Sequence, residues 1–158
     1  MTLTTSTSPR RRSSICLLLN ICTFVRAFLE WPINNRGRYT IIKTYFDHVY
    51  PFAPVLNRTD FIQSYRSGNC SPFLLHSVSA ATSIYVPIEV ISGCGLPDRS
   101  AAKTSFFAKA NLLHKSPCGT GSLSMCQGSI ILGSIIFLTP VICDFQYWLQ
   151  HFVRFSVH

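Results

Sequence analysis

Two prolines between aromatic segments, within residues 45–61, constrain the fold of this chain more than any other feature. Before them, Ile42, Phe46 and Val49 recur at a spacing that places them on one face of a helix. Pro51 is expected to end this helix, because the residue before a proline is disfavoured in helical geometry. The stretch therefore predicts a helix, a rigid apolar elbow and a second helix.

The second helix of this pair is predicted to be short. Thr59 is expected to cap its start, and its apolar residues are Phe61, Ile62 and Tyr65. Three aromatic side chains around the elbow are predicted to be buried against later helices at 72–86 and 98–114: Phe46, Phe52 and Phe61. The elbow carries no catalytic pattern, so we interpret it as a packing element.

The helical pattern continues beyond the elbow. Ser71 and Pro72 are typical of a helix start, with serine at the cap and proline in the first turn. Asp98 is expected to cap another helix. The apolar face of that helix consists of Ala102, Phe106, Ala110 and Leu113. Between these two helices, residues 87–97 are interpreted as a loop, in which 88–91 could also extend a helix or form a short strand.

The last third of the chain is predicted to contain two more helices. The first is indicated by Leu123, Cys126, Gln127, Ile130 and Leu138, and is weakened by two glycines. The apolar run at 130–143 is shorter than the roughly 20 residues that span a bilayer, so we expect a buried helix ending at Thr139 and Pro140. Asp144 is expected to cap the final helix. The predicted fold class is all-α, an array of antiparallel helix pairs.

The composition suggests that part of the apolar surface is covered by something else. Hydrophobic residues make up 47% of the 158 residues and charged residues only 13%, whereas a typical soluble domain has about 25% charged residues. The length indicates one domain. The net charge of +8 is concentrated in residues 1–43. A basic segment of this kind attracts nucleic acid, anionic lipid or transport receptors, and a solvated basic tail is an equal alternative.

Residues 1–38 are predicted to form a separate basic segment that is partly disordered. Within it, the three arginines at 10–12 precede the apolar run at 15–22, an order that is typical of a secretion signal. Asn20 interrupts the run, and no small-x-small cleavage site follows. Ile33 to Arg38 is interpreted as a turn-forming linker to the helical part at 39–158.

The sequence offers no site for catalysis or for a cofactor. The seven cysteines have no Cys-x-x-Cys spacing, and we interpret them as reduced thiols. Asp47 and His48 are adjacent, but the six carboxylates form no pair at the spacing of an acid–base site. His76 is interpreted as a helix-surface or core residue. We assign no catalytic, cofactor-binding, metal-binding or DNA-binding residue, and we expect a protein that is not an enzyme.

Five blocks of the chain resemble, in order, the fungal-specific transcription-factor domain, a helical regulatory region found downstream of a binuclear zinc cluster. The first is the aromatic helix at 45–50 with the elbow Pro51-Phe52-Ala53-Pro54 and the following Arg58 and Phe61. The other four blocks are at 71–75, 105–113, 122–128 and 144–149. Together they cover roughly residues 39–155, and the resemblance implies that 39–158 is the opening part of a larger helical domain.

The resemblance also implies a function and its limits. It implies a nuclear regulatory domain of a transcription factor, with coregulator contact or self-association through apolar helix faces. In the family, zinc and DNA are bound by a six-cysteine cluster that precedes the domain. Cys16 and Cys22 are the only cysteines in the front third of this chain, so no zinc site and no specific DNA binding are expected of the chain alone.

Two other interpretations remain open at the level of sequence. The chain could be a small membrane-associated or secreted protein anchored through residues 15–31, although a membrane role is not the favoured prediction. It could also be a truncated gene product without independent function, which the unmatched first 38 residues favour.

Overall fold

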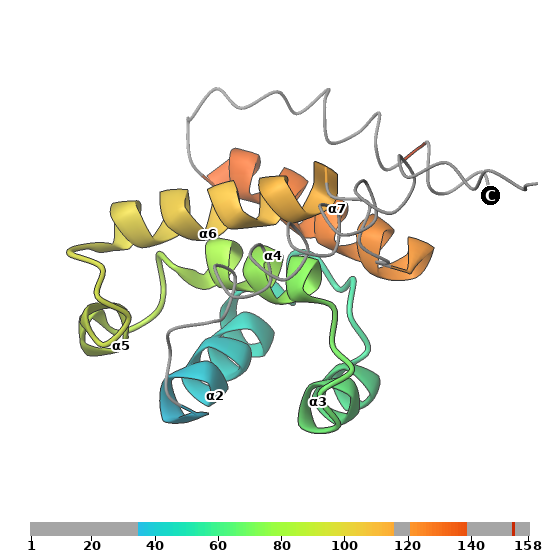
Figure 1. The fold of residues 1–158 in the computed structure, drawn as a ribbon, viewed down its shortest axis with the longest axis horizontal. Helices are drawn as coiled ribbons and strands as arrows, with labels where there is room; N and C mark the ends of the chain where they lie inside the picture. Colours follow the sequence, from blue (N-terminus) through green and yellow to red (C-terminus); the bar gives the residue numbers. More distant parts are fainter. Residues whose placement is uncertain (1–34, 116–120, 139–152, 154–158) are drawn as a thin grey trace, which may run out of the picture. The chain divides into compact units, whose positions relative to one another are not determined.

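The computed structural model describes residues 35–115, 121–138 and 153 (Figure 1). Within these ranges the secondary structure is helical and contains no β-strand, so the predicted all-α class is confirmed. The elements are α2 (Asn35–Thr44), the π-helical segment η1 (Tyr45–Val49), α3 (Arg58–Arg66), α4 (Pro72–Thr82), α5 (Ile88–Ser92), α6 (Arg99–Lys115) and α7 (Ser122–Leu138).

Helix α4 is the centre of the core. It contacts α2, η1, α6 and α7, and all of its residues except Pro72 and Leu75 are buried. A helix that is buried on every side must satisfy its polar groups internally. The hydroxyls of Ser77, Ser79 and Thr82 do so by donating to backbone carbonyls one turn earlier, at 2.7–2.9 Å.

Helices α4 and α6 run antiparallel, as two ring contacts show. Phe73, at the start of α4, contacts His114 near the end of α6. His76, about one turn later in α4, contacts Phe106, which lies about two turns earlier in α6. Ala102 and Ala110, on the same row of α6 as Phe106 and His114, are fully buried. Small side chains at these positions allow the two backbones to approach closely.

The predicted buried face of α6 is correct in its first three residues and wrong at its end. Ala102, Phe106 and Ala110 are buried, but Leu113 is only half-buried and His114 is buried in its place. The first three residues are four apart, and His114 continues that row, whereas Leu113 leaves it. The contact of His114 with the Phe73 ring explains why the row extends to a histidine.

A π-helical turn joins α2 to the elbow. Ile42, Phe46 and Val49 are buried on one face, as predicted. The amide of Tyr50 donates to the carbonyl of Tyr45 at 2.9 Å, the five-residue step of a π-helix. The linker predicted at 33–38 is wrong from Asn35 onward, because α2 already begins there.

The elbow buries two of its three predicted aromatics. Phe46 and Phe61 are buried with their ring centroids 6.1 Å apart, but Phe52 is 78% exposed, so its predicted burial is wrong. The amides of Phe52 and Ala53 both donate to the carbonyl of Val49. This tight turn leaves Phe52 outside, while Ala53 is buried and its carbonyl accepts a hydrogen bond from the Tyr45 hydroxyl at 3.4 Å.

The caps follow the predicted chemistry at α6 but not at α3. Asp98 accepts a hydrogen bond from the Ala101 amide at 2.7 Å, as expected of a cap. At α3 the cap is Asn57 and not Thr59, because Asn57 is extended and its side-chain oxygen accepts from the amides of Thr59 and Asp60. Ser71 occupies the cap position before α4, but its hydroxyl makes no capping hydrogen bond.

The corrected cap gives a direct stability test. Asn57→Ala is expected to lower the free energy of unfolding by about 1 kcal/mol, because two amides of the first turn lose their acceptor. Thr59→Ala should change it by less than about 0.5 kcal/mol, since Thr59 is exposed. Urea denaturation of both variants measures the difference, and a larger loss for Thr59→Ala would contradict the assignment.

The remaining two helices are α5 and α7. The loop predicted at 87–97 is wrong at 88–92, because these residues form the short helix α5, in line with the helical alternative for 88–91. Helix α7 exists as predicted, and its buried residues are Met125, Gly128, Ser129, Ile131, Leu132, Gly133 and Ile135. Leu123, one of the residues that indicated this helix in the sequence, is 71% exposed. The small residues Gly128 and Ser129 determine the register, because Phe73 packs directly against the α7 backbone at Gly128.

Some predictions lie outside the described residues. These are the basic segment with its apolar run at 15–31, the helix end at Thr139 and Pro140, and the final helix that begins after Asp144. The division at residues 38 and 39 also stays a prediction.

Candidate functional site

The pair Asp47 and His48 lies at the surface in η1. Both side chains are exposed. The imidazole of His48 stacks on the Tyr85 ring, with centroids 5.1 Å apart and an interplanar angle of 27°. This contact joins η1 to the turn after α4. The arrangement ties two segments together and places no second carboxylate against the imidazole.

The two other described histidines belong to the core. His76 and His114 are 2% and 8% exposed, and each contacts a phenylalanine ring of the facing helix. Of the two alternatives for His76, the core position is therefore the observed one. Among the residues that the structure describes, no group of three or more histidine, cysteine or acidic side chains could hold a metal ion.

Three cysteines are described, and all three are free thiols: Cys70, Cys94 and Cys126. Burial raises the pKa of the Cys70 thiol to about 12, and burial also raises the pKa of Cys94, with Lys109 acting in the opposite direction. A thiol must be deprotonated to act as a nucleophile. Burial therefore disfavours the thiolate form of Cys70 and Cys94, in keeping with a structural role.

Tyr45 is also held in its neutral form. Burial is the main cause that raises its pKa far above the usual range, and nearby Tyr50 adds to it. Its side chain is fully buried, and its hydroxyl donates to the carbonyl of Ala53. The hydroxyl thus fixes the elbow to η1 and has no acid–base role at neutral pH.

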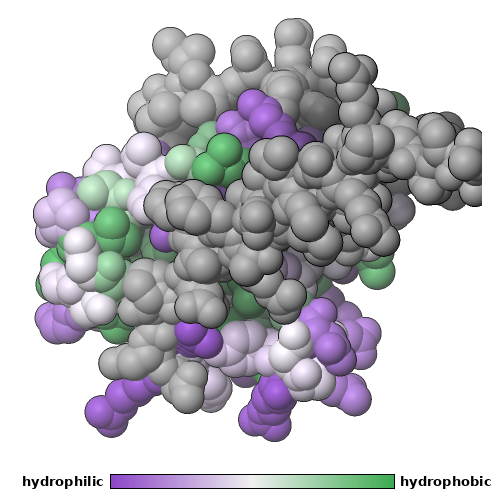
Figure 2. All heavy atoms as spheres, in the orientation of Figure 1, coloured by the Kyte–Doolittle hydropathy of each residue, from purple (hydrophilic) through white to green (hydrophobic). Residues whose placement is uncertain are grey.

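Apolar side chains at the surface are the feature of the described residues that best suits contact with another protein. Leu112 near the end of α6 is 56% exposed, and Leu123 in the first turn of α7 is 71% exposed. Figure 2 shows apolar residues in green at the surface of the face that it draws. Contiguous exposed apolar patches are typical of surfaces that another protein covers, whereas single exposed apolar side chains are common on many surfaces. We call these two residues the exposed leucine pair.

The sequence pattern did not identify this pair as exposed. Leu123 was one of the residues that indicated α7, and Leu112 was not singled out at all. The exposure of Leu112 could have been predicted, because it lies off the buried row formed by Ala102, Phe106 and Ala110. For Leu123 the signal is absent, because the apolar residues of α7 are spread over all sides of the helix.

Among the described residues, no helix combines the length and the apolar character that crossing a bilayer requires. The proposed anchor at 15–31 is outside the described part of the chain.

Comparison with known families decides what kind of domain these helices form. The sequence model described as the fungal specific transcription factor domain matches residues 42–140. The chain belongs to this family. Four of the five blocks that carried the resemblance lie inside the match, and the block at 144–149 lies beyond it. The predicted family is confirmed, and the chain is a regulatory domain segment of a fungal transcription factor.

Curated relatives come from the same class of protein. The fusaric acid cluster transcription factor FUB12 of Gibberella fujikuroi is 60% identical over 114 residues, which cover 72% of this chain and 17% of the relative. The protein of the same name from Fusarium oxysporum f. sp. lycopersici gives the same identity and coverage. Cutinase transcription factor 1 beta of Fusarium vanettenii is 26% identical over 106 residues, covering 64% of this chain and 12% of the relative.

The comparisons cover only a part of those relatives. The chain spans about a sixth of the length of the FUB12 proteins that it matches. No solved structure matches the chain significantly.

Proposed function

We propose that this domain acts in the nucleus by contacting protein, and that it neither reads DNA nor catalyses a reaction. The family match at residues 42–140 is the observation that carries the proposal. The described side chains are consistent with it, since the histidines and thiols serve packing and the exposed leucine pair is available for contact.

The contact would be with a coregulator or with a second copy of the domain. Leu112 and Leu123 come from two helices that both pack on α4. A protein partner that covers them would remove apolar surface from water, at about 25 cal/mol for each Å² buried. Side chains of this kind give no advantage in contacting phosphates, which are bound by lysine and arginine.

The identity to FUB12 supports a finer proposal about the transcription factor. FUB12 is named for the fusaric acid cluster, and 60% identity over 114 residues is high. We infer that the transcription factor to which this domain belongs controls a gene cluster of comparable kind. The two relatives named for fusaric acid and for cutinase show that the family serves different targets.

A gel-shift experiment tests whether the chain binds DNA in a sequence-specific manner. The purified chain is expected to form no sequence-selective complex with a promoter fragment. Any complex that its net charge of +8 supports should disappear between roughly 50 and 200 mM salt, because counterion release weakens non-specific binding steeply. A complex that persists at the higher salt concentration and prefers one sequence over a shuffled control would contradict the proposal.

A further inference from the structure

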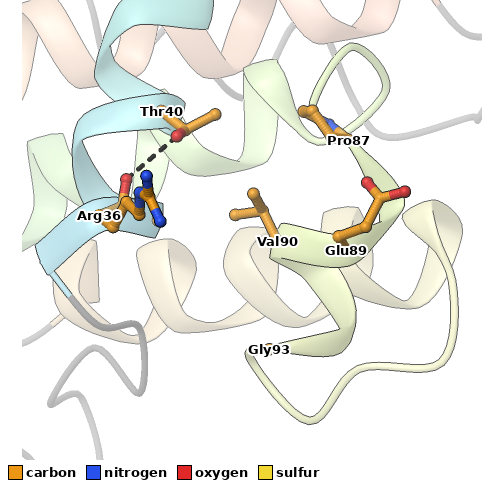
Figure 3. A pocket seen from close by; sticks show the side chains of 7 residues that line it. Arg36, Thr40, Pro87, Glu89, Val90 and Gly93 are labelled. Carbon is orange, nitrogen blue, oxygen red and sulfur yellow. Dashed lines mark hydrogen bonds between the residues drawn. The ribbon is translucent and has the colours of Figure 1, made fainter.

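A pocket of about 340 Å³ lies between the first half of α2 and the short helix α5 (Figure 3). Its lining includes Arg36 and Thr40 from α2, and Glu89 and Val90 from α5. Pockets that hold small molecules measure about 300–1,000 Å³. This one is at the lower end of that range, so it suits a small metabolite.

The pocket carries one positive and one negative side chain. In the view of Figure 3, Arg36 and Glu89 lie on opposite sides with Val90 between them. Both side chains are exposed, and the structure shows no ion pair between these two described residues. A guanidinium suits a carboxylate, because it can donate two parallel hydrogen bonds to it. The carboxylate of Glu89 likewise suits an ammonium group or another cationic donor.

The rest of the lining is neutral. Pro87 and Val90 provide apolar surface, and Gly93 leaves its side of the pocket without a side chain. The Thr40 hydroxyl donates to the carbonyl of Arg36 at 3.0 Å, so its oxygen remains able to accept a hydrogen bond from a ligand. Opposite charges on two sides of an apolar patch match a ligand with the same division.

We propose that this pocket binds a small aminocarboxylic acid with an apolar body. Arg36 holds the carboxylate, Glu89 holds the protonated nitrogen, and the apolar body lies against Pro87 and Val90. The ligand bridges α2 and α5, two elements that come from different parts of the chain. This inference goes beyond the proposed protein contact and does not depend on it.

Calorimetric titration of the full chain with matched probes tests the proposal. 6-Aminohexanoate carries the two charges at opposite ends of an apolar chain, hexanoate carries only the carboxylate, and 1-aminopentane carries only the ammonium group. 6-Aminohexanoate is expected to bind at least about tenfold more tightly than either single-charge probe, since it alone makes both charge-assisted contacts. Inorganic phosphate is expected to bind more weakly than 6-aminohexanoate, because it leaves the apolar wall and Glu89 unused.

Three variants assign the contacts. Arg36→Gln should weaken the binding of 6-aminohexanoate at least about tenfold, and Glu89→Gln should weaken the binding of 6-aminohexanoate but leave that of hexanoate unchanged or tighter. Val90→Phe should abolish binding by filling the pocket without changing a charge. Arg66→Gln on α3, outside the pocket, is the matched control and should bind as the parent does. Circular dichroism confirms that each variant keeps its helicity.

The titration results distinguish the proposed binding mode from its alternatives. No binding of 6-aminohexanoate, equal binding of 6-aminohexanoate and hexanoate, or tighter binding of phosphate would each overturn the proposal. An equal loss in the Arg66→Gln control would also overturn it, since the effect would then be one of total charge. The gel-shift result is unaffected by any of these outcomes, so failure here is distinct from failure of the proposed function.

Discussion

Replacing Phe73 with alanine is expected to lower the free energy of unfolding by about 3–5 kcal/mol. The ring is fully buried, contacts the His114 ring with centroids 5.5 Å apart, and lies directly against the α7 backbone at Gly128. Its removal would leave a cavity at the point where α4 contacts both α6 and α7. Urea denaturation followed by circular dichroism at 222 nm, a wavelength that reports on helices in general, measures the loss.

Phe52→Ala is the matched control for this prediction. The two variants delete the same ring, but Phe52 is 78% exposed, so its loss should change the free energy of unfolding by less than about 0.5 kcal/mol. Equal effects of the two substitutions would mean that Phe73 is not at the junction of the three helices. A loss of stability in Phe52→Ala but not in Phe73→Ala would mean that the core contains the Phe52 ring and not the Phe73 ring.

Gly128→Ala is expected to destabilise the protein by about 1–3 kcal/mol. Alanine is the better helix former by roughly 1 kcal/mol, so helix propensity alone predicts the opposite sign. The steric term is the larger one, because a Cβ atom at this position would stand within 3.0 Å of three atoms of the Phe73 ring. The same denaturation experiment gives the sign and the size.

Two further variants isolate the steric cause. Gly121→Ser adds a side chain just before α7, where a Cβ would meet nothing within 4 Å, and should leave stability equal or slightly higher. Phe73→Leu combined with Gly128→Ala should cost less than the sum of the two single changes, because the smaller side chain makes room for the added methyl group. Stabilisation by Gly128→Ala alone would show that α7 is not packed on Phe73.

The helices themselves were predictable from local sequence. Ile42, Phe46 and Val49 repeat at helical spacing, and the structure buries all three. Asp98 precedes a helix and caps it, as its short polar side chain favours. These features depend on residues within one or two turns of each other, and that is the range over which a pattern in the sequence is informative.

Two misjudged positions depend on geometry that the apolar pattern does not carry. Phe52 is more apolar than Ala53, yet the turn after Val49 places Ala53 inside. Gly128 was counted as weakening α7, yet it is buried and the Phe73 ring of α4 packs against it. At Gly128 a small residue takes the buried position because a large side chain from another helix already fills the space.

The candidate sites were beyond local prediction for the same reason. Arg36 and Glu89 line one pocket but belong to helices separated by three other elements in the chain. The exposed leucine pair is recognisable only once the buried faces of α6 and α7 are known. The family, by contrast, was recognisable from ordered blocks, four of which lie inside the family match.

Transcription from a reporter gene tests the central claim that this domain regulates through protein contact at the exposed leucine pair. The chain is fused to an unrelated DNA-binding domain in a fungal cell. The test variant carries Leu112→Glu and Leu123→Glu together. The control variant carries Thr104→Glu and Ser122→Glu together. The control adds the same charges at exposed positions on the same two helices. Equal protein levels are confirmed by blotting.

We predict that the parent chain and the control change reporter output to the same extent, and that the leucine variant abolishes the change. Two glutamates would replace apolar surface by charge that a partner cannot bury without a large desolvation cost. Reporter output that is unaltered by the parent chain, or altered equally by the parent and the leucine variant, would contradict the claim.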